Sequence, residues 1–115
     1  HSLALSRDGE VFAWGRGSEG QLGRGAIEEM LETPQRVEAL DGQVIALSCG
    51  AAHSAFVSSA GVLLGCGRSA LLGGPAGVSA LQPAPAPIAG PWQGADTQLI
   101  SVACGRAHTL VLADN

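Results

Sequence analysis

The sequence repeats itself, and an internal repeat limits the fold of a chain of this length more than any other feature. The segment from His1 to Gly15 returns 52 residues later at His53, and its opening returns after a further 55 residues at His108. Periods of this size are typical of folds in which each copy is one supersecondary unit that packs on its neighbours. We therefore divide the 115 residues into units 1–52 and 53–107 and the start of a third unit, 108–115.

Each unit is predicted to consist of short strands. Ser2–Ser6 and Glu10–Trp14 alternate apolar with small or polar residues on either side of Asp8-Gly9, a strong hairpin signal. Two further strands are expected near residues 35–40 and 44–48, joined at Asp41-Gly42, and the second unit repeats the pattern over 54–58, 62–65, 86–89 and 99–103. The one helix candidate, 26–32, is too short and ends at Thr33-Pro34. A four-stranded antiparallel unit of this period fits a β-propeller blade.

The composition excludes several classes of function. The net charge is −4, with six arginines, no lysine and ten acidic residues, so we expect no direct binding of nucleic acid. No apolar run approaches the ~18 residues of a membrane-spanning helix. Three cysteines without framework spacing favour a reducing compartment, cytoplasm or nucleus. Because the chain begins and ends inside the repeated pattern, we expect it to be an excerpt of a longer protein.

Two ordered strings of residues carry a family resemblance. Cys49-Gly50-Ala51-Ala52-His53-Ser54 is followed by Ser59-Ala60-Gly61-Val62, and His1–Gly15 is followed by Gly20–Gly25. Both strings resemble the repeat of the regulator of chromosome condensation family, and residues 104–109 repeat its opening signature. The resemblance implies an all-β fold, with two blades and the first strands of a third from a seven-bladed β-propeller.

The second unit departs from the family pattern. Cys66 stands where the first unit has Trp14, and Leu71-Leu72-Gly73 replaces a longer glycine-rich turn. Residues 74–92 contain five prolines and are predicted to include a lengthened loop stiffened by proline. We expect Trp92 in that segment to be exposed, which makes it a candidate contact for a partner.

Arg16 and Arg68 are the other candidate contact residues. They lie 52 residues apart, at the same position of successive units, in the turn that leaves the second strand. Both are expected on one face of the propeller, where they would contact an acidic partner. The alternative is that they are solvated or bond locally to turn carbonyls. The acidic residues Glu28, Glu29 and Glu32 have the same two interpretations, a solvated face or a contact with a basic partner.

No catalytic, metal or cofactor site is predicted. The spacing of Cys49 from His53, repeated in the third unit, supplies only one pair of zinc ligands per unit, and such pairs do not converge. The recurring His is expected to make a hydrogen bond at a strand start, and the recurring Cys to lie in the core. Ser54 next to His53 does not form a hydrolytic pair, because neighbours in a strand face opposite sides.

The resemblance implies a non-catalytic protein–protein interaction module within a larger protein. The alternative is a guanine nucleotide exchange factor for a small Ras-like GTPase, the activity of the founding family member. The expected partner is therefore a protein, with a small GTPase as one candidate, and the expected location is intracellular.

Overall fold

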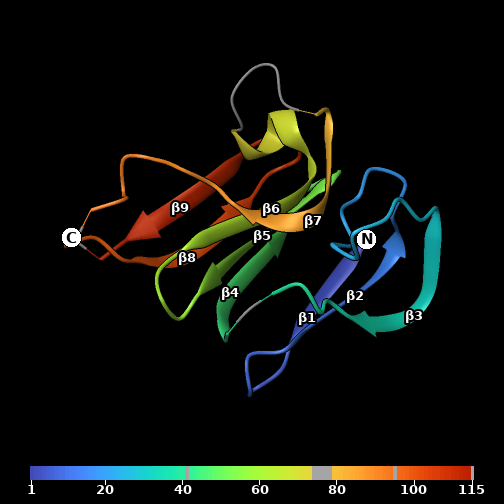
Figure 1. Cartoon of the computed structure of the whole chain (residues 1–115), viewed down its shortest axis with the longest axis horizontal. Coiled ribbons are helices and arrows are strands. Elements are labelled where there is room, and N and C mark those ends of the chain that lie inside the picture. The colour runs from blue at the N-terminus through green and yellow to red at the C-terminus, as the bar shows by residue number, and fades with distance from the viewer. Residues whose placement is uncertain (41, 74–78, 95, 115) are drawn as a thin grey trace.

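Three antiparallel sheets lie side by side in the computed structural model, which describes residues 1–40, 42–73, 79–94 and 96–114 (Figure 1). Sheet 1 contains β1 (Ser2–Leu5), β2 (Val11–Arg16) and β3 (Met30–Arg36). Sheet 2 contains β4 (Val44–Cys49), β5 (His53–Ser58), β6 (Leu63–Arg68) and β7 (Leu81–Pro87). Sheet 3 contains β8 (Leu99–Cys104) and β9 (Thr109–Ala113), and a short 3-10 turn, η1 (Ser69–Leu72), follows β6. The predicted all-β fold is confirmed.

The hairpin signals form the turns that the sequence predicts. Gly9 has a φ of +85°, and its N–H donates to the carbonyl of Ser6 at 3.0 Å. Gly61 repeats this geometry with a φ of +79° and a bond of 2.9 Å to the carbonyl of Ser58. Glycine adopts these positive φ angles without the steric cost that a Cβ would impose. The β1–β2 and β5–β6 hairpins are thus two copies of one local structure.

The sheets are out of phase with the sequence repeat, which corrects the expected strand order. The strand predicted at 44–48 does not close the first unit; it forms β4, which opens sheet 2 by pairing with β5. The third strand of the first unit spans Met30–Arg36 rather than 35–40. Beyond it the chain crosses to sheet 2, where Ser59 N–H donates to the carbonyl of Gln43 at 2.8 Å. Asp41, half of the expected turn signal, lies outside the described residues.

The proline-rich segment is also more regular than predicted. Residues 81–87 form β7, the outer strand of sheet 2, where a loop was expected up to a strand at 86–89. Residues 74–78 of that expected loop lie outside the described residues. Trp92 is half-buried rather than exposed, because it packs against the cluster between sheets 2 and 3.

Apolar side chains gather between the sheets. One cluster joins sheets 1 and 2 and contains Val11, Ala13, Leu22, Val37, Val44, Phe56 and Cys66. A second cluster joins sheets 2 and 3 and contains Ala55, Val57, Leu63, Leu99 and Val102. Every residue of β5 is buried, and alternate side chains of this strand enter the two clusters. Sheet 2 therefore obtains its core from both neighbours.

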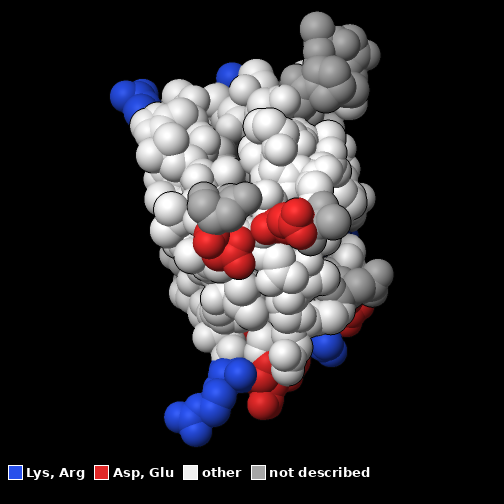
Figure 2. Space-filling model, turned by 90° about the vertical axis from the view of Figure 1, so that its left-hand side faces the viewer, with Lys and Arg blue, Asp and Glu red and all other residues white. Residues whose placement is uncertain are grey.

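Figure 2 shows the side of the molecule that carries sheet 3, with acidic groups near its middle and at its lower end. Ile100, Leu110 and Leu112 are exposed large apolar residues of β8 and β9. The basic groups in this view stand at the upper and lower ends of the face rather than across it. The strands β8 and β9 themselves contain no charged residue.

Candidate functional site

The turn after β2 is held rigidly against sheet 2 by Gln21. The side chain of Gln21 is buried, and its Oε1 accepts the Glu19 N–H at 2.8 Å. Its backbone carbonyl accepts the Ser54 hydroxyl at 2.6 Å and the Cys66 thiol at 3.5 Å. A buried carbonyl with such partners is costly to displace. The turn, and with it Glu19, is therefore fixed relative to the ends of the strands in sheet 2.

Three arginines from successive sheets line one shallow hollow of about 310 Å³ at this end of the molecule. Arg16 ends β2, Arg68 ends β6, and Arg106 lies in the turn between β8 and β9. We call this surface the rim hollow; it is completed by Glu19, Gln21, Ala51, Ala52, Leu71 and Ala107. The structure thus brings the two arginines singled out in the sequence to one place.

The three guanidinium groups differ in their partners. Arg16 Nε donates to Ser18 Oγ at 2.9 Å, and Arg68 Nε donates to Glu19 Oε2 at 3.2 Å. Within the described part of the chain, the guanidinium group of Arg106 has no hydrogen-bond or ion-pair partner, although its backbone carbonyl accepts the Ala51 N–H at 3.3 Å. Both bonds are solvent-exposed, and an exposed ion pair contributes only about 0.2–1 kcal/mol. Half of the six arginines of an acidic chain therefore surround one hollow, and among the described residues of its wall Glu19 is the only acidic one.

Sequence reasoning missed Arg106 because it searched equal positions of the repeat. Arg106 occupies the position of Ala51, between the glycine and the His of the recurring signature, and not the position of Arg16. The available signal was the strand topology. The turn between β8 and β9, which carries Arg106, lies at the same edge of the molecule as the ends of β2 and β6, which carry Arg16 and Arg68.

Trp92 lies in a different hollow from the arginines. That hollow, of about 340 Å³, lies between sheets 2 and 3 and includes Leu72, Ile88, Trp92 and Val111. The indole of Trp92 also packs against the second apolar cluster. The structure therefore does not join Trp92 to the rim hollow, and its role as a partner contact stays a prediction.

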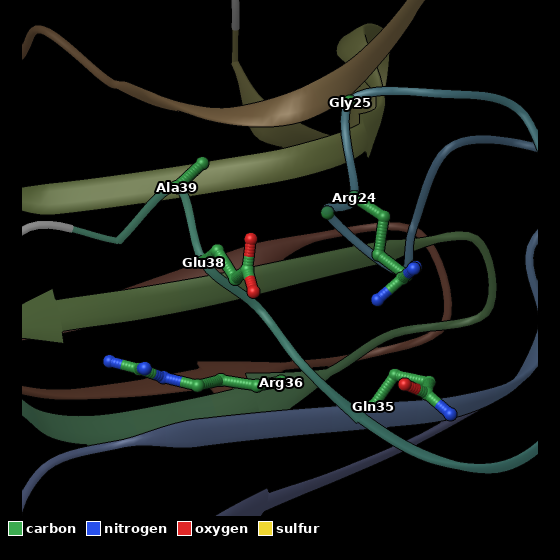
Figure 3. A pocket seen from close by; sticks show the side chains of 7 residues that line it. Arg24, Gly25, Gln35, Arg36, Glu38 and Ala39 are labelled. Carbon is green, nitrogen blue, oxygen red and sulfur yellow. The ribbon is translucent and has the colours of Figure 1, made fainter.

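A third hollow, of about 510 Å³, lies beside β3 (Figure 3). Its two arginines already have partners, since Arg24 Nε pairs with Glu28 at 2.9 Å and Arg36 Nε with Glu10 at 3.2 Å. The guanidinium groups point away from each other, and Glu38 stands between them. This hollow therefore offers an anion much less positive charge than the rim hollow.

The first copy of the recurring His, His1, links the start of sheet 1 to sheet 2. His1 Nε2 lies 2.8 Å from Ser54 Oγ, and because the Ser54 hydrogen is donated to Gln21, His1 Nε2–H must be the donor. Ser54 is fully buried and its proton is engaged, so this pair is a structural link rather than an activated nucleophile. Thr109 of sheet 3 occupies the position of Ser54 in the next unit, and its hydroxyl likewise donates to a backbone carbonyl, that of Leu71, at 2.9 Å. The expected His hydrogen bond is present at His1, whereas neither ring nitrogen of His53 has a partner among the described residues.

The three cysteines are free thiols. Burial raises the pKa of Cys49 and of Cys104, and raises that of the fully buried Cys66 to about 12. The Cys104 thiol donates to the carbonyl of Ser48 at 3.6 Å. Thiols with raised pKa values are poor nucleophiles and poor metal ligands at neutral pH. In the described ranges, no three His, Cys, Asp or Glu side chains gather as metal ligands would.

Antiparallel sheets that repeat one hairpin and share their cores with their neighbours define blades of a β-propeller. Residues 8–57 match the family model of the regulator of chromosome condensation (RCC1) repeat. The chain belongs to this repeat family.

Similar proteins place the same repeats in longer chains. The chain is 40% identical to the human probable E3 ubiquitin-protein ligase HERC6, over all of its own length but 11% of that protein. It is 36% identical to the Arabidopsis thaliana ultraviolet-B receptor UVR8, over 97% of its length and 25% of the receptor. The chain thus spans only a small part of each relative.

Solved structures share the fold. Human WBSCR16 superposes with a TM-score of 0.77 at 27% identity, over 96% of this chain and 27% of that one. Prp20p of Saccharomyces cerevisiae, whose binding to Gsp1p and histones has been described, also gives 0.77 at 24% identity, over 98% and 29%. In the described part of this chain, no helix has the length and apolar character needed to cross a bilayer.

Proposed function

We propose that this chain is a non-catalytic protein–protein interaction module, part of a propeller within a larger intracellular protein of the cytoplasm or nucleus. The rim hollow carries the proposal, because it gathers three guanidinium groups from three sheets on one rigid rim. Loops held on a rigid scaffold are suited to selecting partners. Three free cysteines support the intracellular location.

The partner surface is proposed to be acidic. Arg16, Arg68 and Arg106 outnumber the single Glu19 in the hollow, although the chain as a whole carries a net charge of −4. Guanidinium groups bind carboxylates in planar, two-bonded geometry, which gives selectivity as well as attraction. The proposed partner is therefore a protein segment rich in Asp or Glu, and Trp92 is proposed only as a more distant contact.

Charge reversal in the protein at its natural length tests this function. We expect Arg16→Glu with Arg68→Glu to lose the partners that the unmodified protein retains in a quantitative pull-down. Arg24→Glu with Arg36→Glu is the matched control, because it changes the net charge equally at the hollow beside β3. Unchanged recovery by the rim variant, with intact folding by circular dichroism, would remove the proposal.

Nucleotide exchange on a small GTPase is the alternative function. The likeness to Prp20p, at 24% identity, supports the fold and not an activity. Release of a mant-labelled nucleotide from a panel of small GTPases distinguishes the two functions. An exchange factor accelerates release, whereas an interaction module of the proposed kind leaves the rate unchanged.

A further inference from the structure

The wall of the rim hollow contains its own carboxylate. Glu19 Oε2 accepts a hydrogen bond from Arg68 Nε at 3.2 Å, and the two residues are 49 positions apart in the chain. The ion pair therefore joins the turn of sheet 1 to the end of β6 in sheet 2. A carboxylate from this protein occupies part of the surface that an acidic partner would need.

The two members of this pair differ in exposure and in how their backbones are held. Glu19 is the less exposed, with 23% of its side chain accessible against 58% for Arg68. Its backbone is also fixed, because its N–H donates to the buried Gln21 side chain. Arg68 has a long, solvated side chain that can turn to another acceptor at little cost. An incoming carboxylate can therefore draw Arg68 away while Glu19 stays in place.

Arg106 is the open position of the same hollow. Its guanidinium group has neither a hydrogen-bond nor an ion-pair partner among the described residues, whereas Arg16 is engaged by Ser18 and Arg68 by Glu19. An approaching anion thus meets Arg106 first, without breaking an internal contact. The repeat spacing did not predict Arg106; the folded structure places it beside Arg16 and Arg68 in the rim hollow.

We propose that Glu19 is an intramolecular competitor that occupies Arg68 until a carboxylate-bearing segment of a partner protein, first bound by Arg106, replaces it. This inference rests on the proposed function, since it concerns the same hollow. Competition of this kind weakens binding by the strength of one exposed ion pair and so favours partners that carry several carboxylates over partners that carry one.

Binding of a fluorescein-labelled hexaglutamate peptide, measured by anisotropy with the protein at its natural length, tests the inference. Glu19→Gln should tighten binding about two- to fivefold at low ionic strength, which is the effect of freeing one exposed ion pair. Glu28→Gln is the matched control, because it removes the same charge from the pair with Arg24 and leaves the hollow intact. The gain should shrink at high salt, where exposed charges are screened.

The outcomes separate the inference from the function on which it rests. Arg106→Glu should weaken binding more than the reversal Arg24→Glu does. If Glu19→Gln leaves the affinity unchanged or lowers it while the rim reversals weaken binding, competition is wrong and the acidic contact stands. If no rim reversal alters binding, or if a hexaglutamine peptide binds equally well, both the inference and the proposed function are wrong.

Discussion

At the scale of single residues, the recurring Cys-Gly-x-x-His signature has a steric explanation. A Cβ added to Gly50 would overlap the imidazole ring of His53, and one added to Gly105 would overlap the ring of His108. Each glycine N–H also donates to the carbonyl of the same His, at 2.8 Å and 2.9 Å. The glycine is therefore required because the His ring lies over it, and not because of an unusual backbone angle.

This explanation predicts an order of stabilities for alanine substitutions. Gly50→Ala should lower the free energy of unfolding by about 1–3 kcal/mol, because the buried His53 ring has nowhere to move. Gly105→Ala should cost less, since His108 is exposed and its ring can rotate away. Gly94→Ala is the control, because a Cβ there meets nothing within 4 Å. Urea denaturation measures all three, and equal losses at Gly50 and Gly94 would contradict the steric account.

The buried imidazole of His53 also predicts a pH dependence. Burial lowers its pKa below the ordinary value of 6.5, so the folded protein keeps this ring neutral when the unfolded chain protonates. Stability from this group is present above pH 6.5 and is lost as the pH falls below it, by at most about 1.4 kcal/mol per pH unit. We expect the loss between pH 7.5 and 5.5 to be smaller in His53→Gln than in the unmodified protein. Identical pH slopes in the two proteins would show that His53 does not titrate in this way.

At the scale of secondary-structure elements, the sequence predicted the positions of the hairpin turns. It did not predict which strand pairs with β4. The hairpins at Gly9 and Gly61 were predictable in position from the Gly signal, although each turn is a three-residue loop that ends in a positive-φ glycine rather than a two-residue turn. The partner of β4 was not predictable, because the same alternating strand can pair with the strand before it or the strand after it. The choice depends on burial of Val44 against both Val11 and Phe56, which only the packed sheets reveal. For the same reason Arg16 and Arg68 were found from spacing, whereas Arg106 required the topology.

We predict that the three prolines of β7, the outer strand of sheet 2, keep strands of other molecules from pairing with its outer edge. Ile88 N–H donates inward to the carbonyl of Leu63, whereas the carbonyl of Pro83 faces outward and accepts the Gly25 N–H at 3.0 Å. By the alternation of a strand, the nitrogens of all three prolines in β7 face the outer edge. That edge lacks donors at Pro83, Pro85 and Pro87, and the turn at residues 20–25 already lies against part of it, so another strand would pair with it poorly.

Restoring these donors should therefore promote self-association. We expect the triple variant Pro83→Ala, Pro85→Ala, Pro87→Ala to form concentration-dependent oligomers in analytical ultracentrifugation at concentrations where the unmodified protein does not. Pro91→Ala is the control, since it lies outside the strand. A triple variant that sediments like the unmodified protein would show that the prolines do not protect this edge.

At the scale of the whole molecule, sheet 2 couples the two apolar clusters through one strand. Phe56 and Val57 are both inaccessible to solvent, and they enter the clusters on opposite faces of β5. In the part of the chain that the structure describes, sheets 1 and 3 have three and two strands and share no apolar cluster with each other. Each of them therefore depends on sheet 2, and the three sheets should lose stability together.

Phe56→Ala tests this coupling, because it leaves a cavity only in the cluster between sheets 1 and 2. Removing a fully buried Phe should cost about 3–5 kcal/mol of unfolding free energy. Native-state hydrogen exchange should then show faster exchange in β2 and, by a similar factor, in β9, although β9 contacts the other cluster. Phe12→Ala is the control, since this half-buried residue lies outside both clusters and should cost less. Faster exchange confined to β2 would mean that the sheets unfold separately, and that β5 does not transmit the loss from one face of sheet 2 to the other.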